Sequence, residues 1–274
     1  MQLRGFFKHQ SNPWLFILLA AVILSACQSG NSNSDPANQS ITQNISSASS
    51  VPQQENDWWK SEAEKMVEKQ IKSRGIDDDS LLRVMKNTPR HRFVPEPYQQ
   101  YAYSDQPLPI GHDQTISQPY IVALMTSHLD LQREDKVLEI GTGSAYQAAI
   151  LSALAKEVYT IEIVEALAKS AATLLEEMEY DNVHVRHGNG YKGWPEQAPF
   201  DKIIVTAAPG KIPQELLRQL KAPGKMILPV GDNVQYLKSV SKKQDGSIRK
   251  KTLTGVRFVP MIQPEEGMPD TDFK

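Results

Sequence analysis

Short apolar segments alternate with helical segments through the middle of this 274-residue chain. Apolar runs bounded by turn residues predict buried strands, and apolar residues spaced three to four apart predict helices. The predicted strands are 137–140, 158–161, 183–185, 202–206 and 225–230, and the predicted helices are 144–155, 166–178 and 213–220. This alternation predicts an α/β domain with a doubly wound, mostly parallel, Rossmann-like sheet that helices cover on both faces.

The flanking segments predict further elements. N-terminal helices are expected at 58–74, 80–87 and 120–131, where apolar residues recur at helical spacing. Residues 90–119 contain five prolines and predict a long loop, and long loops in compact domains are usually functional. Two strand-like runs within 236–261 flank a polar turn and predict an antiparallel pair that closes the sheet.

Residues 1–26 have the features of a secretory signal peptide. Arg4 and Lys8 precede an apolar run at 14–24, which is too short to span a bilayer. The segment from Leu24 to Cys27 resembles the lipobox of bacterial lipoproteins, in which the cysteine is lipidated and becomes the first mature residue. This resemblance implies a lipoprotein that is anchored to a membrane of the cell envelope and faces the periplasm. The alternative is a structural apolar helix followed by a chance cysteine.

The rest of the chain divides into a tether and one domain. Residues 27–56 comprise Cys27 and a segment rich in Ser, Asn and Gln, which contains too few apolar residues to fold and predicts a flexible tether. Residues 57–274 are expected to form a single folded domain. The formal net charge of −2 gives no electrostatic case for nucleic acid as the main partner. The six histidines are scattered, and no metal site is predicted.

A glycine-rich turn follows the first predicted strand. Gly141 and Gly143 lie where that strand ends and a helix begins, which is where ligands bind in doubly wound folds. A dinucleotide-binding fingerprint requires a third glycine, but Tyr146 occupies that position. The turn therefore favours S-adenosylmethionine over a dinucleotide, although a plain strand–helix turn is the alternative.

Two polar residues at neighbouring strand ends support the same ligand. Glu162 ends the second strand, about twenty residues after the turn, where a carboxylate can accept hydrogen bonds from both ribose hydroxyls. Asn189, which lies between two glycines after the third strand, is placed to contact adenine. The alternatives are a solvated charge for Glu162 and a turn residue for Asn189.

The segment 114–120, with the sequence QTISQPY, resembles a signature of the protein-L-isoaspartate O-methyltransferases. Similar segments follow in the order 137–143, 186–190, 200–208, 228–231 and 256–260, so the resemblance runs from about residue 66 to residue 260. It implies an S-adenosylmethionine-dependent enzyme that methylates the free α-carboxylate of L-isoaspartyl residues in damaged proteins and peptides. The methyl ester then collapses to a succinimide, which can reopen as aspartate.

The resemblance also implies roles for particular residues. It makes Ser117 the active-site serine, whose hydroxyl orients the substrate carboxylate, and it gives residues 256–260 a part in holding the substrate peptide. The cofactor-binding residues that it implies are Thr115, Ile116, Glu139, Gly141, Gly143, Glu162 and Asn189. No metal is implied.

Two positions depart from the family pattern. Ala145 stands where the family usually has glycine, and Asn189 stands where it usually has aspartate. These departures put the affinity for the cofactor in doubt. Two alternatives therefore remain: a lipid-anchored binder of damaged polypeptides without turnover, and a methyltransferase of another substrate class. A cytoplasmic location, the usual one for the family, also remains open, because translation from Met66 would omit the export signal.

Overall fold

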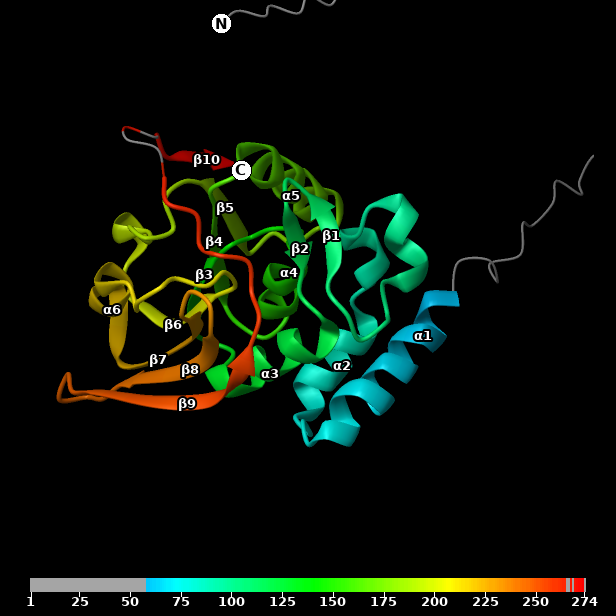
Figure 1. Ribbon diagram of the computed structural model, residues 1–274, viewed down its shortest axis with the longest axis horizontal. Helices are drawn as coiled ribbons and strands as arrows, with labels where there is room; N and C mark the ends of the chain where they lie inside the picture. Colours follow the sequence, from blue (N-terminus) through cyan, green and yellow to red (C-terminus); the bar gives the residue numbers. More distant parts are fainter. Residues whose placement is uncertain (1–57, 265–266, 268, 274) are drawn as a thin grey trace, which may run out of the picture. The chain divides into compact units, whose positions relative to one another are not determined.

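A computed structural model describes residues 58–264, 267 and 269–273. The predicted signal peptide, Cys27 and the tether lie outside the described residues. Within the described part, the main sheet has eight strands in the order β10-β5-β4-β3-β6-β7-β8-β9 (Figure 1). The strands are β3 (Lys136–Ile140), β4 (Glu157–Glu162), β5 (Val183–His187), β6 (Phe200–Val205), β7 (Leu220–Val230), β8 (Gln235–Lys242), β9 (Ile248–Val256) and β10 (Thr271–Phe273).

The five strands from β3 to β7 are parallel, as the sequence predicts. Chain order reverses between β3 and β6, so the switch point of the sheet lies beyond the carboxyl end of β3. The β8–β9 pair is antiparallel, which confirms the prediction for the C-terminal segment. No helix among the described residues is long and apolar enough to cross a membrane.

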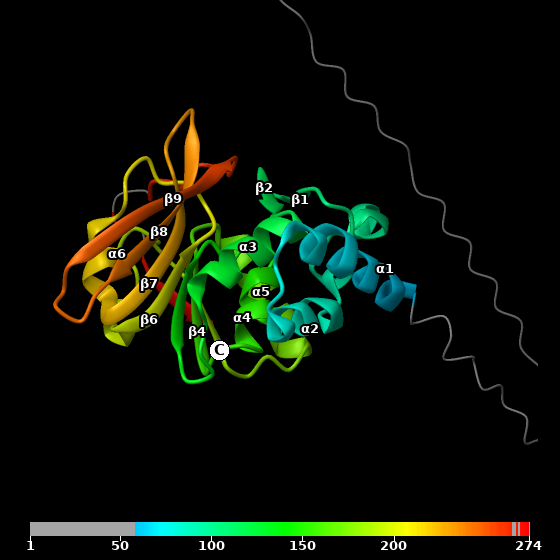
Figure 2. The same ribbon diagram turned by 90° about the horizontal axis from the view of Figure 1, so that it is seen from below.

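Helices cover both faces of the sheet (Figure 2). Alternate residues of β3 serve the two layers: Val137 packs with α3 and α4, whereas Leu138 packs with α6. Both side chains have no exposed surface, as expected for a parallel strand that is buried on both faces. The helices are α1 (Trp58–Met66), α2 (Asp79–Asn87), α3 (Pro119–Leu129), α4 (Tyr146–Ser152), α5 (Glu165–Glu177) and α6 (Gln214–Gln219).

The structure corrects three sequence-based boundaries. The predicted helix 58–74 is α1 followed by a π-helical segment (Val67–Ile71) and a 3-10 turn (Lys72–Arg74). The predicted loop 90–119 contains two 3-10 turns (Arg90–Phe93 and Glu96–Tyr101) and an antiparallel hairpin of β1 (Leu108–Gly111) and β2 (Gln114–Ile116). Helix α4 begins two residues later than expected, because Ala145 has a left-handed backbone with φ of 70°.

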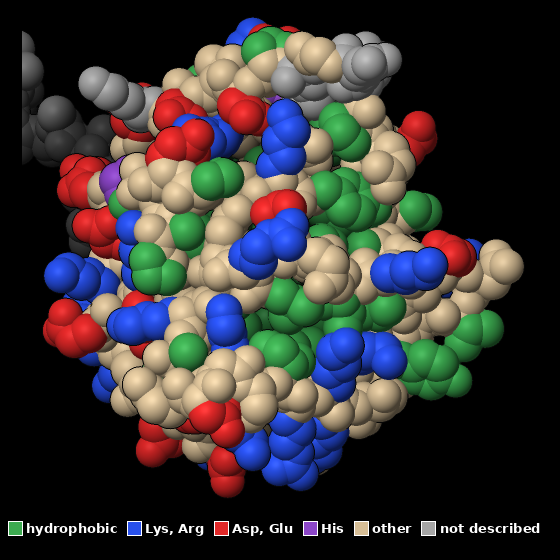
Figure 3. Space-filling view, turned by 90° about the vertical axis from the view of Figure 1, so that its left-hand side faces the viewer, with side chains coloured by type: hydrophobic (Ala, Val, Ile, Leu, Met, Phe, Trp, Pro, Cys, Tyr) green, Lys and Arg blue, Asp and Glu red, His purple; other side chains and the backbone are tan. Residues whose placement is uncertain are grey.

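Both edges of the sheet are protected. Strand β10, which the sequence analysis missed, pairs antiparallel with β5, and the Arg186 guanidinium binds the Asp272 carboxylate across this pair. At the opposite edge, β9 carries the exposed residues Arg249, Lys250 and Lys251. Figure 3 shows several Lys and Arg side chains in the lower half of this side of the molecule. Charged side chains on an open edge oppose pairing with another chain.

Glu139 places a carboxyl group in the middle of the sheet. Its side chain has no exposed surface, and it accepts a hydrogen bond of 2.6 Å from the Thr160 hydroxyl on the neighbouring strand. Burial raises the pKa of Glu139 from 4.5 to about 8, against the opposing effect of this hydrogen bond. The folded protein therefore holds a proton on Glu139 over a pH range in which the unfolded chain has released it.

Stability should consequently fall as the pH rises from about 4.5 to about 8, since unfolding releases the Glu139 proton in this window. We expect Glu139→Gln to be more stable than the parent near pH 8 by a few kcal/mol, with the difference shrinking toward pH 5. Urea unfolding at several pH values measures this difference. The exposed residue Glu134 provides the control Glu134→Gln, and a stability difference that does not change with pH would contradict the expectation.

Candidate active site

The turn after β3 carries unusual backbone conformations. Gly141 has φ of 98° and Gly143 has φ of 52°, in the left-handed region that favours glycine. A Cβ atom at Gly141 would lie 2.5 Å from the Thr206 hydroxyl oxygen, so only glycine fits there. Ala145 also has positive φ, and its methyl group is fully buried among core residues. The alanine that departs from the family pattern is thus accommodated in the turn.

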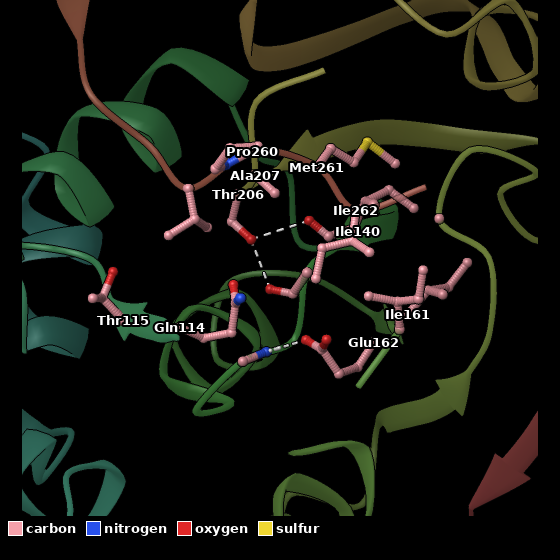
Figure 4. Close-up of a pocket in the computed structure, with 15 residues that line it drawn as sticks. Gln114, Thr115, Ile140, Ile161, Glu162, Thr206, Ala207, Pro260, Met261 and Ile262 are labelled. Atoms are coloured by element: carbon pink, nitrogen blue, oxygen red, sulfur yellow. Dashed lines mark hydrogen bonds between the residues drawn. The ribbon is translucent and has the colours of Figure 1, made fainter. Parts of the chain in front are cut away.

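A cavity opens beside this turn, at the carboxyl ends of β3, β4 and β6 (Figure 4). Its position is the predicted switch point of the sheet, where ligands bind in doubly wound folds. The cavity is lined by Gln114, Thr115, Ile140, Gly141, Gly143, Ile161, Glu162, Ile163, Gly190, Thr206, Ala207, Val259, Pro260, Met261 and Ile262. The structure thus brings Gly141, Gly143, Glu162 and Thr115, four of the predicted cofactor residues, together around one cavity.

Glu162 is the ionisable residue of the cavity wall. It ends β4, only 5% of its surface is exposed, and its two carboxylate oxygens accept the N–H groups of Gly143 at 2.8 Å and Val164 at 3.0 Å. Burial raises the pKa of Glu162, while these backbone hydrogen bonds partly oppose the rise. Each carboxylate oxygen retains a lone pair, so the group can accept further hydrogen bonds from a ligand in the cavity.

Three predicted cofactor residues, Ile116, Glu139 and Asn189, do not line this cavity, and Ile116 lines a neighbouring cavity instead. Glu139 lies within the sheet beneath the turn and bonds to Thr160, so the structure corrects its placement. Its neighbour Ile140 provides the wall instead, because successive residues of a strand point to opposite faces. The Asn189 side-chain oxygen accepts the Tyr191 N–H at 2.9 Å and forms a turn, and the adjacent Gly190 lines the cavity. The Asn189 side chain therefore acts as a turn residue, which was the alternative to a contact with adenine.

A smaller cavity adjoins the first and contains Ser117. The two share Thr115, Gly141, Gly143 and Thr206 as lining residues. The smaller cavity is also lined by Ile116, Ser117, Val122, Thr142, Ser144, Tyr146 and Gln147. Strand β2 and the residue after it thus bring Thr115, Ile116 and Ser117 to the edge of the glycine turn. One cavity holds a buried carboxylate and the other a hydroxyl, with a shared wall between them.

Several lining residues were missed by the sequence analysis. Thr206 follows β6, and its hydroxyl lies 2.6 Å from the Gly141 carbonyl oxygen and 3.0 Å from the Ile140 carbonyl oxygen (Figure 4). Its position at the carboxyl end of a predicted strand was the available signal. Met261 and Ile262 belong to the C-terminal tail, which is fixed by backbone hydrogen bonds from Ala208 N–H to Val259 and from Met261 N–H to Ala208. The resemblance marked residues 256–260 for the substrate peptide, but no sequence pattern indicated that Met261 and Ile262 would line this cavity.

The arrangement fits group transfer between two bound molecules. Among residues 58–264, 267 and 269–273, no cluster of three or more His, Cys, Asp or Glu side chains could hold a metal ion. The larger cavity offers a buried acceptor and close backbone approach, and the smaller offers a hydroxyl and backbone groups. Such a site binds and orients its ligands, which is the main requirement for a displacement reaction whose nucleophile is already ionised.

Comparison with known proteins agrees with this geometry. Residues 61–266 match the family model described as protein-L-isoaspartate(D-aspartate) O-methyltransferase. A protein-L-isoaspartate O-methyltransferase from Opitutus terrae is 55% identical over 204 residues, which cover 74% of this chain and 87% of the relative. A second, from Gloeobacter violaceus, is 51% identical over 205 residues, which cover 73% of this chain and 100% of the relative.

A solved structure is similar in fold as well. It is described as a protein-L-isoaspartate O-methyltransferase from Plasmodium falciparum in complex with S-adenosyl-L-homocysteine. It superposes with a TM-score of 0.65 at 27% identity, over 73% of this chain and 98% of the other. The family match, the two relatives and this fold confirm the family that the segment 114–120 indicates. The chain belongs to the protein-L-isoaspartate(D-aspartate) O-methyltransferase family.

Proposed function

We propose that this protein transfers the methyl group of S-adenosyl-L-methionine to the free α-carboxylate of L-isoaspartyl residues in proteins and peptides. The methylation initiates repair of the damaged residue to aspartate. The observation that carries the proposal is the pair of adjoining cavities in a chain of this family, one with the buried Glu162 carboxylate and the other with Ser117.

The larger cavity has the chemistry that the methyl donor requires. Glu162 would accept hydrogen bonds from the ribose hydroxyls, because its carboxylate is buried and retains lone pairs. Gly141 and Gly143 allow the backbone to approach the ligand closely. Ile140, Ile161 and Met261 form apolar walls around the remaining space. Asn189 would act through the turn that presents Gly190.

The smaller cavity has the chemistry that the acceptor requires. A carboxylate is a nucleophile at neutral pH, so its oxygen can form the new bond to the methyl carbon while the bond from that carbon to the sulfonium sulfur breaks. No strong general base is needed, and rate depends on alignment of the reacting atoms. The Ser117 hydroxyl would donate a hydrogen bond to the substrate carboxylate and fix its orientation, with Thr115 and Ile116 forming the adjacent wall.

Ser117→Ala tests the role of the hydroxyl. We expect turnover on an isoaspartyl peptide to fall by roughly ten- to a thousand-fold, the range for loss of one orienting contact, with much less change in donor affinity. Transfer of labelled methyl groups from the donor measures turnover. A peptide with ordinary aspartate should remain unlabelled, because its side-chain carboxylate lies one carbon away from the required position.

The matched control is Ser127→Ala, since the Ser127 hydroxyl donates to the Leu124 carbonyl within α3, away from both cavities. Full activity of Ser117→Ala would remove Ser117 from the reaction. Equal labelling of the two peptides by the parent protein would reject repair and favour a methyltransferase of another substrate class. Donor binding without labelling of either peptide would favour a binder without turnover.

Glu162→Ala tests the donor site. We expect donor affinity to fall by about 1.5–3 kcal/mol for each ribose hydrogen bond lost, as measured by calorimetric titration with S-adenosylhomocysteine. Binding to the parent should weaken toward acidic pH, because burial raises the Glu162 pKa and protonation removes a charged acceptor. Glu165→Ala, an exposed substitution at the start of α5, is the control. Unchanged affinity in a folded Glu162→Ala protein would exclude Glu162 from the donor site.

We further propose that the protein is exported and lipidated at Cys27, which would anchor the domain to the cell envelope on the side of the periplasm. The support is the basic, apolar and small-residue order of 1–26, which ends in a lipobox-like segment. The alternative is the cytoplasm, which is where the family usually occurs.

Cys27→Ser should release the protein from the membrane fraction, because an anchor of two or more acyl chains holds a protein stably and the variant would have none. Fractionation of cells that express the two forms measures this, and mass spectrometry of the mature N-terminus identifies the lipid. If both forms are recovered in the cytoplasm with an intact N-terminal segment, the proposed anchor is wrong.

A further inference from the structure

Arg90 is a cation buried away from the sheet. Its side chain has no exposed surface, and it lies in the 3-10 turn Arg90–Phe93 before the β1–β2 hairpin. Its Nε donates to the Ala102 carbonyl oxygen at 2.7 Å, and its Nη2 donates to the Ser117 carbonyl oxygen at 2.7 Å. The guanidinium carbon lies 4.7 Å from the centre of the Tyr146 ring. One side chain therefore contacts three segments that are distant in sequence.

Two of those segments form the smaller cavity. Ser117 and Tyr146 both line it, and Tyr146 is the first residue of α4, directly after the glycine turn. Arg90 itself does not line either cavity. It contacts the backbone of Ser117 on one side and the ring that begins α4 on the other. The Arg90 guanidinium thus contacts both Ser117 and the first residue of α4, which follows the glycine turn.

Burial of Arg90 is unfavourable by itself. Desolvation lowers the pKa of its guanidinium to about 10, which still leaves the group charged at neutral pH. Its Nε and Nη2 donate to backbone carbonyls, and no salt bridge with a carboxylate forms among the described residues, so only Tyr146, Tyr103 and the more distant Asp105 oppose the desolvation. A well-packed apolar residue would generally stabilise such a position as well as a buried charge does. The shape of the guanidinium explains why an arginine occupies this buried position. Its planar group donates to two carbonyl oxygens at fixed positions.

We infer that Arg90 is a positioning residue for the methyl transfer. It holds the Ser117 backbone against the helix that follows the donor-binding turn, so that the serine hydroxyl stays aligned with the reacting atoms. The inference rests on the proposed role of Ser117. It assigns Arg90 no contact with donor or substrate, and its effect is on orientation. A displacement of about 1 Å in such a site can lower the rate by about a hundred-fold.

Arg90→Lys separates positioning from simple stability. Lysine keeps the charge but has a single ammonium group, which cannot hold both carbonyls in the fixed geometry of the fork. We expect kcat on an isoaspartyl peptide to fall by roughly ten- to a hundred-fold, while KM for the peptide and Kd for S-adenosylhomocysteine change by less than about three-fold. The control is Arg92→Lys, an exposed substitution in the same turn, which should leave all three constants unchanged.

Chemical rescue provides a measurement that a structural role alone would not predict. In Arg90→Ala, low millimolar guanidinium should occupy the space of the lost head group and restore part of kcat, whereas methylammonium should not, because it lacks the planar fork. Hydrogen–deuterium exchange provides a measurement that is independent of activity. In Arg90→Lys, amides of residues 114–118 should exchange about ten-fold faster or more, with no change in β3 and β4.

The outcomes decide between the two proposals. If the parent labels the isoaspartyl peptide and Arg90→Lys retains its kcat, the positioning role is wrong. A parallel loss of kcat, donor affinity and folding in both Arg90 variants would also overturn it, since that pattern indicates a structural role alone. If the parent labels no isoaspartyl peptide, the proposed function fails, and the exchange of residues 114–118 still tests whether Arg90 holds this segment.

Discussion

A Cβ atom at position 141 would lie 2.5 Å from the Thr206 hydroxyl oxygen, so the turn after β3 requires glycine at this position. The arrangement of the site depends on this turn. The chain leaves β3 through Gly141 and Gly143, both at positive φ, and it can then turn tightly into α4. The tight turn brings the Gly143 N–H to the Glu162 carboxylate on the neighbouring strand. It also leaves the Ile140 and Gly141 carbonyl oxygens beside Thr206 on the other neighbour. A single close turn thus joins the ends of three strands around one cavity.

Two buried glutamates next to this turn, Glu139 and Glu162, differ in their hydrogen-bond partners and in their access to the cavity. Burial raises the pKa of both Glu139 and Glu162. Glu162 accepts two backbone N–H groups, which favour its charged form, and its carboxylate borders the cavity. Glu139 accepts a single hydroxyl hydrogen bond inside the sheet, and its pKa of about 8 favours the neutral form below that pH. Of the two, only Glu162 borders the cavity and can accept hydrogen bonds from a ligand there.

These differences explain what could be predicted from the sequence. The parallel strands were predictable because apolar runs buried on both faces leave a strong pattern, and the end of such a strand places Glu162 at the cavity. Glu139 was predicted to contact the cofactor but lies inside the sheet, because the segment around the glycine turn does not indicate which face of the strand the Glu139 side chain occupies. The β1–β2 hairpin was missed because its strands have three or four residues and include Pro109. Arg90 gave no signal, because its partners are backbone carbonyls, which have no sequence pattern.

The C-terminal tail shows how a weak sequence signal can still support the site. Strand β10 consists of Thr271, Asp272 and Phe273, too short and polar to predict, and it lies beyond the end of the family match at residue 266. Its Asp272 carboxylate binds the Arg186 guanidinium, which is only 8% exposed and lies 4.0 Å from the centre of the Trp194 ring. Without β10 this cation would lose its Asp272 partner and keep only the exposed Glu196 carboxylate, whose oxygen lies 3.0 Å from the Arg186 Nη1. The same tail supplies Val259 to Ile262 to the cavity wall, and Asp270 accepts the Asn189 N–H in the turn that presents Gly190. The tail therefore stabilises the turn after β5, which contains Asn189, one of the two residues that depart from the family pattern.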